Sequence, residues 1–194
     1  MRRRLLFIAP MLACVTLAGC TGGSASSAAR PTGPATAPTT KLTEPAGSPG
    51  NPMVFSCGEE SFTNDPVPQQ PQPGDLAVGP LVIFNARQLA TGNPSDWGEH
   101  GSYKIPIMVT MGSTVTVTIN PPARGHVVID NRYAPHGVTA ATYRSCPDVT
   151  GFYAQGFAFT DGRIRGCVPL AVRVGGQARV QRVTLSLFAG SCAA

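Results

Sequence analysis

The chain has 194 residues, of which 13% are charged and 42% are hydrophobic, and its formal net charge is +5. This length accommodates one or two domains. Charge this sparse is unlike that of proteins that bind nucleic acids by neutralising many phosphates, so no nucleic-acid partner is expected.

The N-terminus has the pattern of an export signal. Three arginines at residues 2–4 precede an apolar run over residues 5–17, which is shorter than the roughly 20 residues of a membrane-spanning helix. The run ends at Leu17-Ala18-Gly19-Cys20, which resembles the lipobox of bacterial lipoproteins. The resemblance implies that residues 1–19 are a lipoprotein signal peptide and that Cys20 carries diacylglycerol, which anchors the chain at the extracytoplasmic face of the cell membrane. An ordinary signal peptide with an incidental cysteine is the alternative.

Cleavage before Cys20 would also change the charge of the protein. It removes three of the 15 basic residues and none of the 10 acidic ones, so the formal net charge falls from +5 to +2. The basicity of the whole chain therefore belongs largely to the signal peptide, and a nucleic-acid partner loses its main support.

Residues 20–52 are expected to form the lipidated cysteine and a disordered linker. The segment after Cys20 contains six Thr, four Ser and six Pro, and Leu42 is its one large aliphatic residue. Such a composition cannot bury enough apolar surface to offset the entropy lost on ordering. A flexible linker of this kind would hold the following domain away from the membrane.

Residues 53–194 are expected to form one all-β domain. Short β-prone runs recur between Gly, Pro, Asn and Asp, at residues 81–85, 103–110, 114–120, 126–131, 138–144, 152–160, 167–174 and 179–188. No segment shows a helical repeat over 10 residues. The pattern predicts a disulfide-stabilised antiparallel β-sandwich that is immunoglobulin-like in the broad sense.

Three local features refine the expected strands. In residues 114–120 aliphatic side chains alternate with threonines, which predicts one buried face and one face toward water. Pro106 and Pro169 lie inside expected strands and favour sheet edges for them, because proline donates no backbone hydrogen bond. The apolar alternation of the last run changes phase around Arg182, which suggests a β-bulge there.

The cysteines predict two disulfides. Cys14 lies in the signal peptide and Cys20 is the lipidation site, which leaves Cys57, Cys146, Cys167 and Cys192. An even number in an exported chain implies two bonds, with three pairings open. We favour Cys146 with Cys167, across a short loop, and Cys57 with Cys192, which would join the start of the domain to its last strand. The spacing of these cysteines does not match a zinc site, and no metal or other cofactor is expected.

A set of residues in the C-terminal half is shared with a known group of proteins. They are Cys146-Pro147, Phe152, Gly156-Phe157, Cys167-Val168-Pro169-Leu170, Val172, Arg179, Leu185-Ser186, Gly190 and Cys192, together with Cys57 and Gly79-Pro80 earlier in the chain. In these positions the chain resembles uncharacterised secreted lipoproteins of high-GC Gram-positive bacteria, and its 13 Arg against 2 Lys fit such a genome. The resemblance implies a β-rich fold with disulfides and brings no activity and no catalytic residues.

Residues 95–100 form the segment with the most suggestive chemistry. They bring together Asp96, Glu99, His100 and Trp97, the one tryptophan of the chain. Carboxylates and an imidazole can bind a cation or act as general acid and base. The alternative is a solvated connection in which Trp97 covers a sheet edge. Signature motifs of serine hydrolases and dinucleotide-binding proteins are missing from the sequence, so no catalytic residue is assigned.

Arginines accumulate near the C-terminus, at Arg163, Arg165, Arg173, Arg179 and Arg182. On one face they would meet anionic lipid headgroups or cell-wall polymers. Otherwise they form an ordinary strand exterior.

These observations together predict a membrane-anchored surface lipoprotein whose domain is a binding or interaction module of the cell envelope. Its candidate partners are an envelope protein or a cell-wall polymer, besides the membrane reached through Cys20. One alternative is an envelope hydrolase or metal-assisted enzyme that uses Asp96, Glu99 and His100. Another is a purely structural envelope component.

Overall fold

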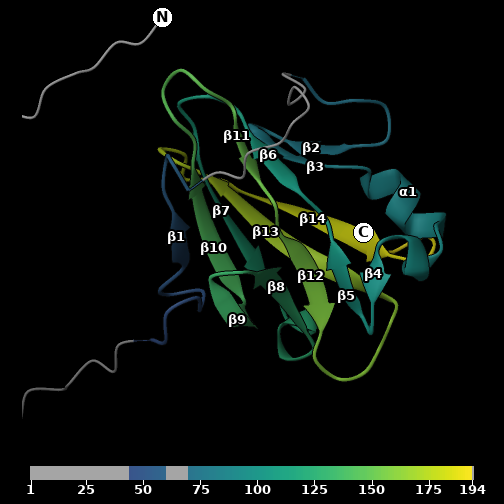
Figure 1. Ribbon diagram of the computed structural model, residues 1–194. Coiled ribbons are helices and arrows are strands. Elements are labelled where there is room, and N and C mark those ends of the chain that lie inside the picture. The colour runs from purple at the N-terminus through teal and green to yellow at the C-terminus, as the bar shows by residue number, and fades with distance from the viewer. Residues whose placement is uncertain (1–43, 60–69, 194) are drawn as a thin grey trace, which may run out of the picture. The chain divides into compact units, whose positions relative to one another are not determined.

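The computed structural model describes residues 44–59 and 70–193, of which 46% lie in strands and 9% in helices (Figure 1). The prediction of a nearly all-β domain with two disulfides is confirmed. The predicted signal peptide (residues 1–19), the lipidation site Cys20 and the linker up to residue 43 lie outside the described residues.

The first sheet has five strands in the spatial order β1-β10-β7-β13-β14. Their bounds are Met53–Phe55 (β1), Ala140–Arg144 (β10), Thr114–Ile119 (β7), Gly166–Val174 (β13) and Val180–Leu187 (β14). Strand β1 runs parallel to β10, and the other neighbours are antiparallel. In β7 the three aliphatic side chains are buried and the three threonines are half-buried on the opposite face, as their alternation predicts.

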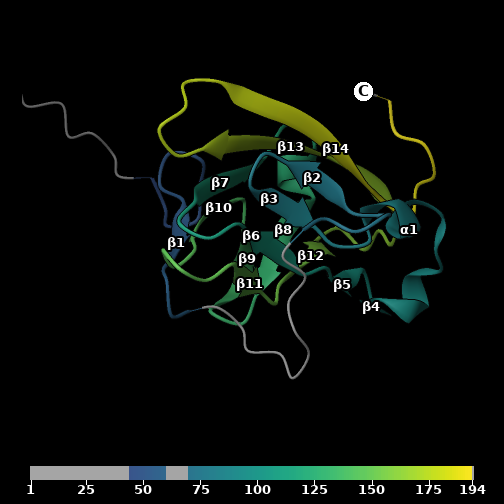
Figure 2. The same ribbon diagram turned by 90° about the horizontal axis from the view of Figure 1, so that it is seen from above.

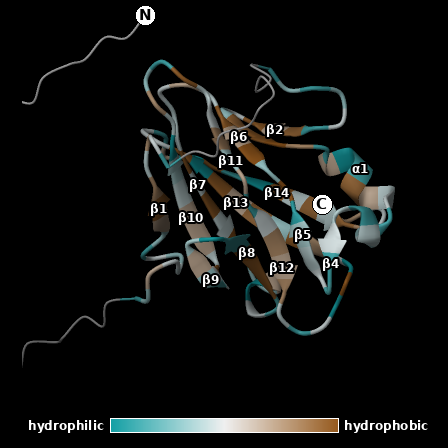
Figure 3. Ribbon diagram, in the orientation of Figure 1, coloured by the Kyte–Doolittle hydropathy of each residue, from teal (hydrophilic) through white to brown (hydrophobic). Residues whose placement is uncertain are grey.

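Two further sheets complete the domain. One has the order β11-β6-β3-β2 and the other β4-β5-β12-β8-β9. The bounds are Gly151–Tyr153 (β11), Ile107–Val109 (β6), Leu81–Ile83 (β3), Leu76–Val78 (β2), Gly98–Glu99 (β4), Ser102–Lys104 (β5), Gly156–Phe159 (β12), Val127–Asn131 (β8) and Ala134–Val138 (β9). Strands β3 and β6 are apolar without alternation, because both of their faces are buried (Figure 3).

Pro106 marks a bend shared by two of these sheets. The expected strands 103–110 and 152–160 are each divided, into β5 and β6 and into β12 and β11. The register nevertheless continues across the division, and the Ile105 amide donates to the Gln155 carbonyl over 2.8 Å. The expected edge position of Pro106 is wrong, since β5 and β6 each have a neighbour on both sides. Pro106 lies where this continuous strand pair passes from the third sheet into the second.

Two expectations for the last hairpin are also wrong. Pro169 lies in β13, which is an interior strand between β7 and β14. Its carbonyl accepts from the Asn120 amide, just past the end of β7. Because proline has no N–H, only the return hydrogen bond at this end of the β7–β13 pair is missing. Arg182 pairs with Ala171 in an unbroken register, without a bulge. A register shift occurs instead between Ile129 and Asn131, where β8 pairs with β9.

Among the described residues, three short helices connect the strands: α1 (Ala86–Thr91) and the 3₁₀ turns η1 (Pro94–Asp96) and η2 (Ala123–Gly125). The buried Leu89 and two backbone bonds hold α1 on the chain after β14, because the Leu89 and Ala90 carbonyls accept from the Phe188 and Gly190 amides. A helix of six residues is too short to give a helical repeat in the sequence. In the described part of the chain, no helix has the length and hydrophobicity needed to cross a bilayer.

An aromatic cluster links the first sheet to β11. The Tyr143 ring lies 5.3 Å from that of Phe55 and 5.0 Å from that of Tyr153, and all three side chains are buried. The Tyr143 hydroxyl donates to Oε1 of Gln155, and the Tyr153 hydroxyl donates to the Arg144 carbonyl over 2.9 Å. Burial raises the pKa of Tyr143, so its hydroxyl keeps the proton that it donates.

The disulfides join Cys57 to Cys146 and Cys167 to Cys192, which corrects the favoured pairing. Strand β1 lies beside β10, so Cys57 and Cys146 meet just beyond the ends of two parallel strands. Both β10 and β13 run antiparallel to β7. Cys146 follows the end of β10 and Cys167 lies at the start of β13, so these two cysteines are at opposite ends of the sheet. The chain instead turns back after β14 and brings Cys192 to Cys167.

Residues 44–52, which composition assigns to the linker, pack on the domain. The Gly47 carbonyl accepts from the amides of Thr139 and Ala140, each at a distance of 2.8 Å. Gly47 has a φ of +82°, and a Cβ there would approach Val138 Cγ1 to 2.3 Å. The folded unit therefore begins before Met53, through a turn that only glycine fits at this position.

The turn at residues 44–51 is expected to respond to pH. The Glu44 carboxylate accepts from Ser48 Oγ and from the Gly50 amide, each over 2.8 Å, and these two bonds lower the pKa of Glu44 below its ordinary 4.5. Because the folded-state pKa is lowered, this contribution is present above pH 4.5 and is lost as the pH falls through the lower folded value. The Gly50 amide proton shift in NMR spectra should titrate with a midpoint below 4.5. In Glu44→Gln it should stay flat, and a wild-type midpoint at or above 4.5 would contradict the contact.

Candidate functional site

A hollow of about 860 Å³ opens on the outward face of the third sheet. It is lined by Asp96, Trp97, Gly98, Glu99, Ser102, Tyr103, Lys104, Pro106, Asp130, Asn131, Arg132, Ala154, Gln155 and Gly156. The lining comes from η1 and β4, from β5, from the end of β8 and from the connection into β12. Rigid strands therefore supply most of the site.

Gly156 of β12 leaves space at the base of this hollow because it has no side chain. Gly156 pairs with Lys104 on one side and with Asp130 on the other. A Cβ at Gly156 would lie 1.9 Å from the Tyr103 carbonyl oxygen, so a larger residue would force β12 away from β5. With no side chain rising there, Ser102 Oγ reaches across β12 and donates to Asp130 Oδ2 over 2.7 Å. This bond fixes the orientation of one carboxylate of the hollow.

Gln155 connects the hollow to the interior of the domain. The side chain is buried, with 7% exposed, and its Oε1 accepts from the Tyr143 hydroxyl. Its backbone carbonyl also pairs with Ile105. The side chain and the backbone of Gln155 are thus each held by one hydrogen bond, which fixes the place of this residue in the lining.

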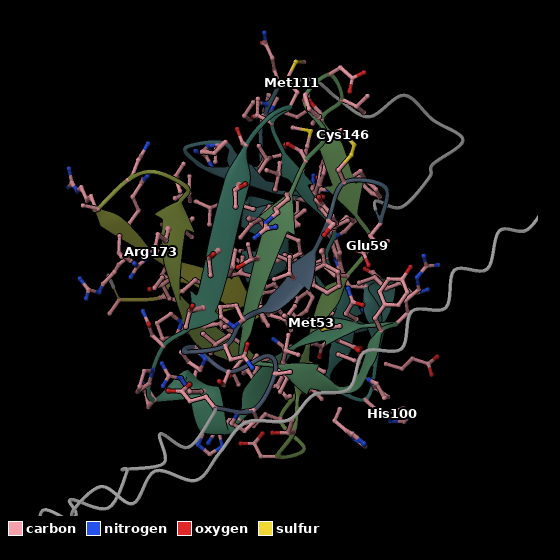
Figure 4. The ribbon with its side chains drawn as sticks, turned by 90° about the vertical axis from the view of Figure 1, so that its left-hand side faces the viewer. Met53, Glu59, His100, Met111, Cys146 and Arg173 are labelled. Carbon is pink, nitrogen blue, oxygen red and sulfur yellow. A yellow bond between two sulfur atoms is a disulfide. The ribbon has the colours of Figure 1, made fainter. Side chains whose placement is uncertain are left out.

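The segment singled out in the sequence is only partly brought together. Asp96, Trp97 and Glu99 line the hollow, whereas His100 does not. His100 is an exposed residue of the β4–β5 turn with φ of +52°, and Figure 4 shows it projecting away from the domain. Trp97 has both a structural place and a place in the candidate site. It packs partly against the hydrophobic core, and it also lines the hollow.

The hollow combines a largely apolar lining with polar and charged side chains. Carboxylates (Asp96, Glu99, Asp130), cations (Lys104, Arg132), amides (Asn131, Gln155) and one indole (Trp97) face the same space. Within the described ranges, no group of three or more His, Cys, Asp or Glu side chains is placed to hold a metal ion. Such a set can hydrogen-bond a ligand that has many polar groups and can stack its apolar side on the indole.

Sequence reasoning missed Ser102, Lys104, Asp130 and Gln155. The one available signal is that Ser102 and Lys104 alternate with the buried Tyr103, which marks them as outward residues of a strand. Their approach to Asp130 depends on the pairing of β5 and β8 with β12, which no local pattern indicates.

A second cluster lies beside a hollow of about 310 Å³. Asp161 Oδ2 is 3.0 Å from His126 Nδ1 and 3.0 Å from Arg163 Nε. The described lining of this hollow contains no Ser, Thr or free thiol, because its one cysteine, Cys167, is in a disulfide. The cluster ties the end of η2 to the loop before β13.

Comparisons with known proteins give no relative from which a function could be inferred. The chain matches no protein-family model, no curated protein and no solved structure.

Proposed function

We propose that the protein is a membrane-anchored surface lipoprotein whose domain binds a glycan of the cell envelope in the hollow beside Trp97. The observation that carries the proposal is the hollow itself, where an indole, carboxylates, amides and cations line the same space. A sugar ring offers an apolar C–H face for stacking and a rim of hydroxyls for hydrogen bonds. A polymer of sugars in the cell wall supplies such a ligand.

The location at the envelope rests on the N-terminal pattern and on the disulfides. The basic residues, the apolar run and the motif ending at Cys20 favour export and lipidation. Two disulfides are compatible with an oxidising environment outside the cytoplasm. The anchor would place the domain among the polymers that it binds.

We also infer that the sheets pack face to face as a β-sandwich. Support comes from the inner face of the first sheet, where Tyr143 and Phe55 contact Tyr153 of β11. Aromatic side chains from two sheets then share one core. In this arrangement the hollow lies on an outward face and stays open to a long polymer.

Binding has more support than catalysis. A hydrolase that uses Asp96, Glu99 and His100 needs these side chains to converge on one bond, but His100 lies outside the hollow. Asp130 is held by Ser102, an arrangement that suits a fixed hydrogen-bond acceptor.

The test is titration of the full chain with soluble glycan fragments of the cell wall, followed by calorimetry. Trp97→Ala is expected to weaken binding at least tenfold, because the stacking surface is lost, whereas Trp97→Phe keeps most of it. His100→Ala is the matched control and should bind like the wild type. Unchanged affinity in Trp97→Ala would contradict the proposal. Cleavage of the fragments that stops in His100→Ala would establish the enzyme instead.

A further inference from the structure

The outward face of the first sheet carries positive charge without negative charge. The described strands β1, β10, β7, β13 and β14 contain three arginines, Arg144, Arg173 and Arg182, and no Asp or Glu. Arg179 lies in the β13–β14 turn and, with Arg182, lines a hollow of about 600 Å³. We call Arg144, Arg173, Arg179 and Arg182 the arginine face.

Strand register places three of these arginines on one side of the sheet. Arg173 follows the buried Val172 and lies opposite Thr116, while Arg144 follows the buried Tyr143 and lies opposite Thr114. Arg182 lies opposite Ala171, on the diagonal from Arg173 at roughly 7–8 Å between Cα atoms. From β10 to β14 the charges extend over three strand spacings, or roughly 14 Å.

Threonines fill the space between these charges. Thr114, Thr116 and Thr118 of β7 point to the same side, and Thr116 Oγ1 lies 2.7 Å from Thr142 Oγ1. Hydroxyls beside guanidinium groups are suitable donors to phosphate oxygens. The face thus combines a row of donors with fixed positive charge.

The arginine face is not neutralised by the described part of the domain. The two ion pairs found among the described residues both use Asp161, and neither involves an arginine of the face. Figure 4 shows Arg173 at the β13–β14 hairpin with nitrogen-tipped side chains around it. An external anion is therefore the natural partner of this charge.

Arg163 and Arg165 do not belong to this face, so the five C-terminal arginines do not share one surface. They precede β13, at the end opposite Arg173. Arg163 pairs with Asp161, and Arg165 Nη1 donates to the Phe188 carbonyl over 3.3 Å. Both have partners within the domain.

We propose that the arginine face docks on the phosphate groups of anionic phospholipids. These charges span the width of four neighbouring strands. They therefore fit a surface with many phosphates better than they fit a single small anion. Residues 21–43 separate Cys20 from the described domain, and 23 residues of random coil span roughly 25–30 Å, a length that keeps the face within reach of the bilayer. Docking through this face rests on the anchor of the proposed function, but not on its glycan site.

Docking would leave the glycan site free. In Figure 2 the first sheet lies along one side of the domain, and β5 and β12 lie on the other side of the core. The arginine face and the hollow beside Trp97 are therefore presented in different directions. The domain can rest on lipid with one sheet and hold a polymer with the other.

The experiment places the full chain, lipidated at Cys20, in vesicles of phosphatidylglycerol or of phosphatidylcholine. Energy transfer from a fluorophore at the C-terminus to a labelled lipid reports the ratio of docked to undocked domains. Docking is expected in the phosphatidylglycerol vesicles, and 1 M salt should abolish it. Each arginine removed should lower the ratio about fivefold, so Arg144→Gln, Arg173→Gln and Arg182→Gln together should lower it about a hundredfold.

The control removes the same charge elsewhere, through Arg163→Gln and Arg165→Gln and through Arg87→Gln at an exposed position of α1, and should dock like the wild type. Equal loss in both triple variants would overturn the proposal, as would equal docking on the two lipids. If soluble anionic wall polymer binds the wild type more tightly than phosphatidylglycerol does, and the triple variant of the arginine face loses that binding, the face would be assigned to the polymer instead. Intact mass spectrometry tests the acyl chains at Cys20 separately, so a missing anchor is distinguished from a face that does not dock.

Discussion

Replacing Cys57 and Cys146 together by serine is expected to lower the free energy of unfolding by about 4.6 kcal/mol. The bond joins residues 89 apart in sequence, and the chain-entropy model gives this figure for a loop of that length. The consequence is also local, since β1 has only three residues and a single neighbouring strand. Without the bond, β1 should detach and take Phe55 out of the aromatic cluster. Urea denaturation measures the global change, and hydrogen exchange at Val54 and Phe55 measures the local one.

The other disulfide provides the comparison. Cys167 and Cys192 are 25 residues apart, and the same model gives about 3.5 kcal/mol for their replacement by serine. A smaller loss for the Cys57–Cys146 pair than for the Cys167–Cys192 pair would contradict the entropic explanation. Peptide mapping without reduction tests the pairing directly, and a fragment joining Cys146 to Cys167 would overturn it.

Tyr143→Ala is expected to destabilise the domain by about 3–5 kcal/mol, the range for removing a large aromatic side chain from a core. The Tyr143 side chain is fully buried and contacts the rings of Phe55 and Tyr153. Its loss leaves a cavity, and it also leaves Oε1 of the buried Gln155 without its donor. Because Gln155 lines the hollow, the variant should bind glycan more weakly as well. Urea denaturation and calorimetry measure the two effects.

Tyr143→Phe separates the hydroxyl from the ring and should cost about 1–2 kcal/mol. Burial raises the pKa of Tyr143 above its ordinary 10, so above pH 10 the unfolded chain releases a proton that the folded chain keeps. The stability contributed by this group is therefore constant below pH 10 and falls as the pH rises further. Tyr143→Phe should lack that part of the alkaline decline. A variant as stable as the wild type at pH 7 would show that the bond to Gln155 contributes nothing.

Local sequence patterns were sufficient to predict which face is buried in a strand that faces water on its other side. The alternation of aliphatic residues and threonines in β7 gives a buried and an open face wherever the strand is placed, because successive side chains point to opposite sides. Cysteine number and composition likewise predicted two disulfides in an all-β domain. Asp96, Trp97 and Glu99 were recognised because polar and aromatic groups stand close together along the chain.

The tertiary structure decided which strands are neighbours, and the candidate sites depend on that. Lys104 and Asp130 share a hollow only because β5 and β8 both pair with β12, where Gly156 leaves the space between them open. Cys57 reaches Cys146 because β1 lies beside β10, and the C-terminal arginines separate because they lie at opposite ends of β13. Periodicity reports how a single strand presents its two faces. Contacts between distant segments are set by packing of the whole core, which no local pattern contains.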